Sequence, residues 1–191
     1  MRIVAGIAGG VPLFAPKTGE IRPTMDQVRG AIFSSLADFV VGARVLDLFS
    51  GAGALGLEAV SRGAASATLV EKDRRAIASI RRNLEKTRLS AAVIESDVFG
   101  YLDRQAPAGG FDLILADPPY AKRSGDRDFT PELLGSASLR RALAPDGIFV
   151  LEHLPGAKLP LGEYWECFRQ KRYGATEVAF LRAAGAPEPE P

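Results

Sequence analysis

Short apolar segments alternate with helix-forming segments through the middle of this 191-residue chain, and this alternation restricts the fold more than any other feature. The segments that are typical of strands cover residues 44–49, 67–71, 92–95, 111–116 and 148–152. Helical patterns lie between them, at residues 55–62, 74–86, 99–104 and 131–143. Strands that are joined through helices pair in parallel, because only a long crossover brings the chain back to the same end of the sheet. The sequence therefore predicts an α/β fold with a mostly parallel, doubly wound sheet.

The N-terminal 40 residues depart from this alternation. Two short β segments surround a turn at Gly9-Gly10, which is typical of a hairpin. Thr24 and Gln27 then form a capping box before a helical pattern. We expect residues 1–40 to form a small extension, a β-hairpin plus a helix, on the main domain.

The C-terminal part predicts an antiparallel hairpin, with one strand at 165–171 and the other at 176–181. This hairpin would close the sheet of a main domain that covers residues 41–182. Residues 183–191 are rich in alanine, proline and glutamate, a composition that is typical of a disordered tail.

Composition narrows the functional classes. The formal net charge is +1, so any contact with nucleic acid must come from local patches rather than from overall charge. Cys167 is the only cysteine and His153 the only histidine, which excludes a disulfide within the chain and a cysteine- or histidine-rich metal site. We expect no metal. No apolar run approaches the roughly 20 residues that span a bilayer, and a cytoplasmic protein is expected.

A glycine-rich turn follows the first strand of the main domain. Gly51, Gly53 and Gly56 form a G-x-G-x-x-G pattern between that strand and the next helix. Glycines at this place allow a tight turn and a close approach of the backbone to a ligand. Glu71 ends the second strand, 20 residues after Gly51, where a carboxylate can bind ribose hydroxyls. The pattern is typical of either an NAD site or an S-adenosylmethionine site.

Acidic residues at the strand ends distinguish these two cofactors. Asp47 lies at the end of the first strand, and Asp97 follows the third, where it could reach an adenine amine. NAD carries an anionic pyrophosphate, which a nearby carboxylate opposes. S-adenosylmethionine has no phosphate and carries a sulfonium and an ammonium group, both of which a carboxylate attracts. The sequence therefore predicts an S-adenosylmethionine site.

Asp117-Pro118-Pro119-Tyr120 follows the strand at 111–116. Each proline fixes its own φ and removes a backbone donor, so the carbonyls near the acid are left free. A carboxylate, a free carbonyl and a ring face together suit a flat group that bears an amine. These four residues are the catalytic candidates. The expected cofactor-binding residues are Asp47, Phe49, Gly51, Gly53, Gly56, Glu71, Lys72, Asp97, Val98 and Asp117, with Arg22 and Thr24 before the first helix.

These motifs resemble those of class I methyltransferases. They resemble most closely the RsmD family of bacterial 16S rRNA guanine-N2 methyltransferases, from Met1 to about Leu181. Two segments carry the likeness: Arg22-Pro23-Thr24 before the first helix, and Asp117-Pro118-Pro119-Tyr120. The resemblance implies a Rossmann-like, monomeric enzyme. Its substrate would be 16S rRNA in the small ribosomal subunit or an assembly intermediate.

The resemblance also implies roles for the catalytic candidates. Asp117 would accept one N–H of the guanine amine, the Pro118 carbonyl would accept the other, and Tyr120 would stack on the extruded base. Such family members carry basic residues in the N-terminal hairpin, whereas residues 7–12 of this chain contain none. Lys122, Arg123 and Arg127, in the loop beyond Tyr120, are therefore the candidates for phosphate contacts.

Three other functions remain open. DNA adenine-N6 methylation uses a similar acid–proline segment, but the only insert here is the short stretch 121–130. Methylation of a glutamine amide in a protein typically uses asparagine where this chain has Asp117. A protein that binds S-adenosylmethionine and assists ribosome assembly without essential catalysis is the third.

Overall fold

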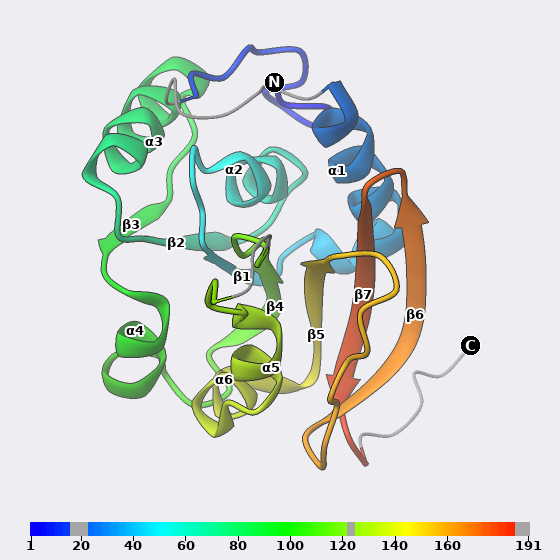
Figure 1. Ribbon diagram of the computed structural model, residues 1–191. Helices are drawn as coiled ribbons and strands as arrows, with labels where there is room; N and C mark the ends of the chain where they lie inside the picture. Colours follow the sequence, from blue (N-terminus) through cyan, green and yellow to red (C-terminus); the bar gives the residue numbers. More distant parts are fainter. Residues whose placement is uncertain (16–22, 122–124, 186–191) are drawn as a thin grey trace.

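The computed structural model describes residues 1–15, 23–121 and 125–185. A seven-stranded sheet has the strand order β3-β2-β1-β4-β5-β7-β6 (Figure 1). The strands are β1 Arg44–Leu48, β2 Ser66–Glu71, β3 Ala92–Glu95, β4 Phe111–Ala116, β5 Leu143–His153, β6 Trp165–Tyr173 and β7 Thr176–Ala183. β1 to β5 pair in parallel, and β7 pairs antiparallel with both β5 and β6. The predicted doubly wound sheet with a terminal antiparallel hairpin is confirmed.

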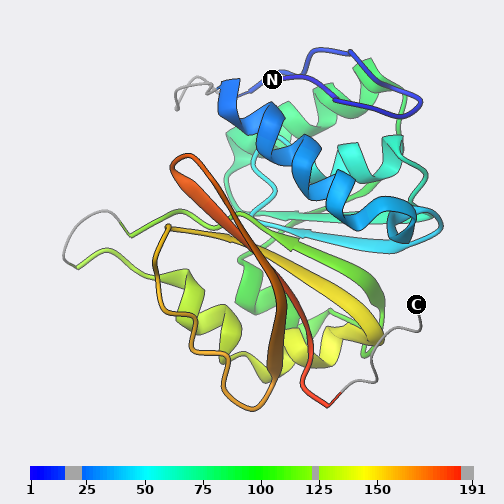
Figure 2. The same cartoon turned by 90° about the vertical axis from the view of Figure 1, so that its right-hand side faces the viewer.

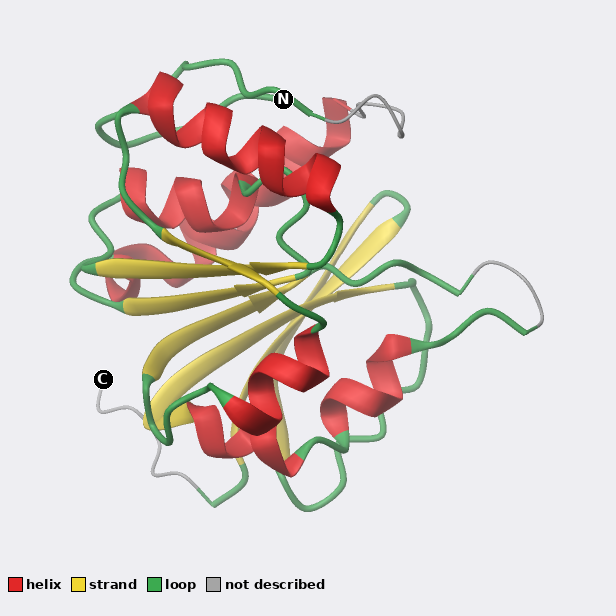
Figure 3. Cartoon of the chain, turned by 90° about the vertical axis from the view of Figure 1, so that its left-hand side faces the viewer, coloured by secondary structure: helices red, strands yellow, loops and turns green. Residues whose placement is uncertain are grey.

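Helices cover both faces of the sheet (Figures 1 and 3). One layer contains α1 Pro23–Leu36, α2 Ala54–Ser61 and α3 Arg74–Thr87, with the short 3-10 helix Ala37–Val40 after α1. The other contains α4 Val98–Arg104, α5 Phe129–Leu134 and α6 Ala137–Ala142. Successive strand side chains point to opposite faces, so Leu46 and Leu48 pack in the core beside α4 to α6, and Val45 packs beside α1 to α3. Each layer therefore has its own apolar core.

The predicted helix over 131–143 is wrong in form, because two short helices occupy this region. α5 ends with Gly135 as its C-cap, and the Ser136 side chain accepts from the Leu139 N–H to cap α6. β5 then begins at Leu143, five residues before the predicted strand. β7 extends through Ala183, which is buried. Ala183, the first residue of the expected disordered tail, therefore belongs to the sheet. Residues 186–191 lie outside the described residues.

The N-terminal segment folds back on itself as an antiparallel loop rather than as two extended strands. The Ile3 N–H donates to Val11 O, and one bridge joins Arg2 and Pro12. This segment packs on α2 and α3 beside α1 (Figure 2). α1 begins at Pro23, so Thr24 lies within its first turn instead of preceding it. No helix in the described ranges is long and apolar enough to cross a membrane.

Candidate active site

The carboxyl ends of β1, β2 and β4 meet at one edge of the sheet. Leu48, the last residue of β1, pairs with Val70 of β2 on one side and with Ala116 of β4 on the other. Glu71 and Asp117 follow directly after Val70 and Ala116, and the glycine turn begins three residues after Leu48. Ligands of doubly wound sheets bind at this edge. The register therefore brings together the two motifs that lie about 60 residues apart in the sequence.

The glycines of the turn are required by close packing against β1 and β2. Gly53, the N-cap of α2, has φ 80°, and a Cβ there would lie 2.9 Å from Leu69 Cδ2. A Cβ on Gly56 would lie 3.1 Å from Asp47 Oδ2. In the absence of that Cβ, the Gly56 N–H donates to Asp47 Oδ2 at 2.9 Å. The turn and the Asp47 carboxylate are thus fixed to each other.

Glu71 fixes the other side of the turn. Its Oε2 accepts from the Gly51 N–H at 2.8 Å, and its Oε1 accepts from the backbone N–H groups of Lys72 and Asp73 at 2.8 and 2.9 Å. Two carboxylate oxygens together offer about four acceptor positions, so the group retains capacity for a ribose hydroxyl. The Lys72 side chain itself is exposed.

The remaining predicted cofactor residues lie near α4. Asp97 Oδ1 accepts from Phe99 N–H and Gly100 N–H at 3.1 and 3.3 Å and so caps the helix. Val98 is buried in the core. Phe49 is half-buried against the Phe129 ring at 5.0 Å between centroids. The structure therefore gives all three side chains a packing or capping contact, and their cofactor contacts stay predictions.

Asp117-Pro118-Pro119-Tyr120 forms the opposite side of the site. Asp117 is half-buried, Pro118 is buried and Pro119 is exposed. The half-buried Tyr120 directs its hydroxyl to the Thr176 hydroxyl at the start of β7. The C-terminal hairpin, which no pattern in the sequence connects with the site, therefore holds the ring.

Glu152 is a site residue that the sequence reasoning missed. It lies near the end of β5, where Leu151 pairs with Ala116 of β4, so Glu152 lies level with Asp117. Its carboxylate accepts from the Thr176 side chain and feels the charges of Asp117, Asp47 and Arg29. One sequence signal existed: Glu152 is a single acid after the apolar run Ile148–Leu151, as Asp117 is after its own strand.

Burial raises the pKa of three carboxyl groups of the site, and neighbouring carboxylates add to the increase at Asp47 and Glu152. Burial raises the pKa of Asp47 to about 7, against the Gly56 hydrogen bond, which lowers it, and the charges of Asp117 and Glu71 add to the increase. Burial raises the pKa of Asp117 to about 6. Burial, then the charge of Asp117, puts the pKa of Glu152 well above its usual range. A ligand with positive charge and no phosphate would relieve this repulsion, and S-adenosylmethionine fits that requirement.

The predicted phosphate-binding residues are only partly described. Lys122 and Arg123 lie outside the described residues, as does Arg22, which is predicted to bind the cofactor. Arg127 pairs with Glu132 through two short contacts, 2.7 Å from Nε and 2.6 Å from Nη2, and its guanidinium lies 4.7 Å from the Phe129 ring centroid. An arginine with these partners has a structural role in the free protein, which weakens its assignment as a phosphate contact.

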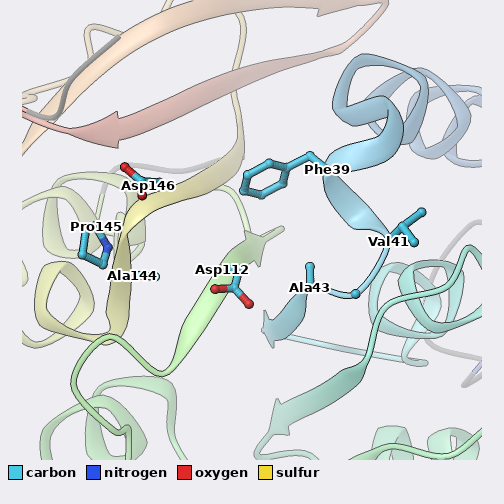
Figure 4. Close-up of a pocket in the computed structure, with 8 residues that line it drawn as sticks. Phe39, Val41, Ala43, Asp112, Ala144, Pro145 and Asp146 are labelled. Carbon is cyan, nitrogen blue, oxygen red and sulfur yellow. The ribbon is translucent and has the colours of Figure 1, made fainter. Parts of the chain in front are cut away.

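A cavity of about 300 Å³ lies at the opposite edge of the sheet (Figure 4). Phe39, Ala43, Asp112 and Asp146 are among its lining residues. Asp112 stands at the start of β4 and forms an ion pair with Arg44 at 2.7 Å. The amino ends of parallel strands are not where doubly wound sheets bind their ligands. We therefore place the active site at the edge formed by the carboxyl ends of the parallel strands.

The chain matches known proteins over nearly its whole length. Residues 1–182 match the family model described as conserved hypothetical protein 95. Ribosomal RNA small subunit methyltransferase D of Escherichia coli K12 is 38% identical over 182 residues, which cover 94% of this chain and 87% of that protein. The solved structure of the hypothetical protein TTHA0928 from Thermus thermophilus is 31% identical with a TM-score of 0.78, over 96% of this chain and 99% of that one.

A third relative was solved with ligands. The 16S rRNA N2 G1207 methyltransferase RsmC of Thermus thermophilus, in complex with AdoMet and guanosine, is 28% identical with a TM-score of 0.71. The match covers 87% of this chain and 44% of that one. The chain thus has the fold of the class I methyltransferases, and its cofactor is S-adenosylmethionine. The resemblance seen in the sequence is confirmed: this chain belongs to the conserved hypothetical protein 95 family, together with the ribosomal RNA small subunit methyltransferases D.

Proposed function

We propose that this protein transfers a methyl group from S-adenosylmethionine to the exocyclic N2 of one guanine in 16S rRNA, within the small ribosomal subunit or an assembly intermediate. One observation carries the proposal. The glycine turn with Asp47 and the segment Asp117–Tyr120 lie at the same sheet edge, close enough for the charge of Asp117 to raise the pKa of Asp47. The names of the relatives support the substrate class. We further propose that the protein acts as a cytoplasmic monomer.

The side chains of this site compensate for the low nucleophilicity of the guanine amine. The N2 lone pair is delocalised into the purine ring, so attack requires the nitrogen to become more tetrahedral. The cofactor supplies an electrophilic methyl group on a sulfonium. Asp117 accepts one N–H, the Pro118 carbonyl accepts the other, and together they orient the lone pair and stabilise the developing positive charge. Asp117 then receives the proton that N2 loses.

Tyr120 supplies the binding surface for the base. A base that reacts at N2 must leave its stack or be unpaired already, and an aromatic ring offers a replacement for the lost stacking. The contact between the Tyr120 and Thr176 hydroxyls fixes one end of the ring. A ring that is held before the substrate arrives loses less conformational entropy on binding.

The substrate assignment is tested by transfer of labelled methyl groups. We expect label from labelled S-adenosylmethionine to enter small subunits that lack the modification, and nucleoside digestion to recover it as N2-methylguanosine. Naked 16S rRNA, duplex DNA and a release factor serve as competing acceptors. Label on N6-methyladenine would replace this proposal by DNA or RNA adenine methylation. Label on a protein glutamine, or cofactor binding without transfer to any acceptor, would support the other two alternatives.

The pH dependence of the reaction should report the ionisation of Asp117. The pKa of Asp117 is raised to about 6, so the carboxylate is ionised at pH 8 and protonated at pH 5. The protonated form is a weaker acceptor and cannot take the proton that N2 loses, so kcat/KM should fall about tenfold per pH unit below pH 6. The measurement is kcat/KM between pH 5 and 9 with subunits as substrate. The Asp117→Asn variant should lack this inflection, and an identical inflection in that variant would assign it to another group.

A further inference from the structure

Within the described residues, the last strand of the sheet carries three cations without carboxylate partners. β6 ends the strand order, so one of its edges pairs with β7 and the other is not covered by a strand of this sheet (Figure 2). Arg169, Lys171 and Arg172 are exposed, and none forms an ion pair with any residue of the described ranges. Their polar contacts are with neutral groups: Arg169 with Ser35 O, Lys171 with Ser35 Oγ, and Arg172 with Gly174 O.

The two glutamates of the β6–β7 hairpin bind other groups and not these three cations. Glu166 pairs with Arg182 through two contacts of 3.1 and 2.9 Å. Glu177 lies opposite Arg172 in the register, but its Oε2 accepts from the Gly156 N–H at 3.0 Å. This half of β6 therefore presents uncompensated positive charge, in a protein whose formal net charge is only +1.

The three cations begin beside the active site and lead away from it. Tyr173 pairs with Thr176, and the Thr176 hydroxyl contacts that of Tyr120. At about 3.3 Å per strand residue, Arg172 lies about 3 Å and Arg169 about 13 Å from Tyr173 along the strand. A polyanion bound at Tyr120 can therefore reach these cations along the strand edge.

We infer that Arg169, Lys171 and Arg172 of β6 bind the phosphate backbone of the RNA next to the target guanine. This inference rests on the proposed function. Strand side chains alternate, so Arg169 and Lys171 point to one face and Arg172 to the other, and the edge presents cations on both of its sides. Arginine and lysine contacts to phosphates position a nucleic acid without reading its sequence. This edge supplies the positive charge that residues 7–12 lack.

The test is the salt dependence of RNA binding by the variant Arg169→Gln/Lys171→Gln/Arg172→Gln. The logarithm of affinity for naked 16S rRNA is measured against the logarithm of KCl concentration. Loss of three phosphate contacts should reduce the slope by about 2–3, since each contact contributes about 0.7–0.9. KM for small subunits should rise at least tenfold, while kcat at saturating substrate stays within about twofold.

Two matched variants control for charge and for folding. Replacing Arg81, Arg88 and Arg104 with glutamine makes the same change in net charge at exposed positions on other elements and should leave the slope unchanged. The variant Arg169→Lys/Lys171→Arg/Arg172→Lys keeps every charge and should keep the wild-type slope. Cofactor binding by calorimetry shows that each variant is folded.

The outcomes separate this inference from the proposed function. A wild-type slope in the glutamine variant overturns the inference. Edge strands also carry charge to prevent pairing with another sheet, so new oligomers with a wild-type slope would assign the cations to that role instead. Weakened binding to subunits with unchanged binding to naked rRNA would point to a ribosomal protein and would equally overturn it. Wild-type protein that methylates no guanine N2 refutes the proposed function whatever the slope is.

Discussion

Replacing Asp117 with alanine is expected to lower kcat by about 10²–10³, the usual cost of removing one group that stabilises transition-state charge. Affinity for S-adenosylhomocysteine should change little, because Gly51, Gly56 and Glu71 are held by contacts that do not involve Asp117. The free protein should be at least as stable as wild type, since burial raises the pKa of Asp117 to about 6 and its ionised form is disfavoured in the fold at pH 8. Single-turnover kinetics, calorimetry and thermal unfolding measure the three quantities.

The control for this variant lies at the other end of the same strand. Asp112 forms a partly exposed ion pair with Arg44, at the edge of the sheet opposite the active site. Asp112→Ala also removes one carboxylate, from the other end of β4. The kcat of this variant should stay within about twofold of wild type, because exposed ion pairs contribute little to stability. Equal losses of kcat in both variants would mean that damage to β4, and not the loss of a catalytic group, explains the effect at position 117.

The mostly parallel sheet and the edge that carries the candidate site followed from local patterns in the sequence. Five apolar segments separated by helical ones predict a parallel sheet, and parallel strands carry their ligands at the carboxyl edge. Gly51, Gly56 and Asp117 could therefore be assigned to one edge without coordinates. The split between α5 and α6 was also readable in principle, because Gly135-Ser136 places a helix-terminating glycine before an N-cap serine.

The residues that sequence reasoning missed act through contacts with distant parts of the chain. Glu152 joins the site only through the pairing of Leu151 with Ala116, and through Thr176 on a third strand. Asn83 accepts from Phe14 N–H at 2.7 Å and donates to Phe14 O and Ala52 O at 2.9 Å, so it connects the N-terminal segment to the glycine turn. Both the register and the Asn83 bridge depend on packing between segments far apart in sequence, so the acid after the apolar run Ile148–Leu151 was the one local sign of either.

Replacing Glu58 with alanine is expected to lower the free energy of unfolding by about 3–5 kcal/mol, the cost of breaking a buried ion pair by removing one partner. Glu58 is fully buried in α2, 3.5 Å from Arg29 Nε and 2.7 Å from Arg62 Nε. Its two oxygens also accept from the backbone N–H groups of Val4 and Ala5 at 2.7 and 3.0 Å. With alanine at position 58, the buried positive charge of Arg29 would lose one of its two carboxylate partners. The backbone N–H groups of Val4 and Ala5 would lose their acceptor.

The expected fall in melting temperature is about 6–20 °C, at about 2–4 °C per kcal/mol for a chain of this size. Glu95 provides the matched control, because it pairs with Arg74 at the same 2.7 Å while 47% of the Glu95 side chain and 86% of the Arg74 side chain are exposed. Glu95→Ala should cost at most about 1 kcal/mol. Glu58 anchors the N-terminal segment, and Phe14 of that segment contacts Asn83, which in turn contacts Ala52 of the glycine turn. Glu58→Ala should therefore also weaken cofactor binding, which calorimetry below the melting transition measures. Equal melting temperatures for the two variants would show that the buried contacts of Glu58 stabilise the fold no more than the exposed ion pair of Glu95 does.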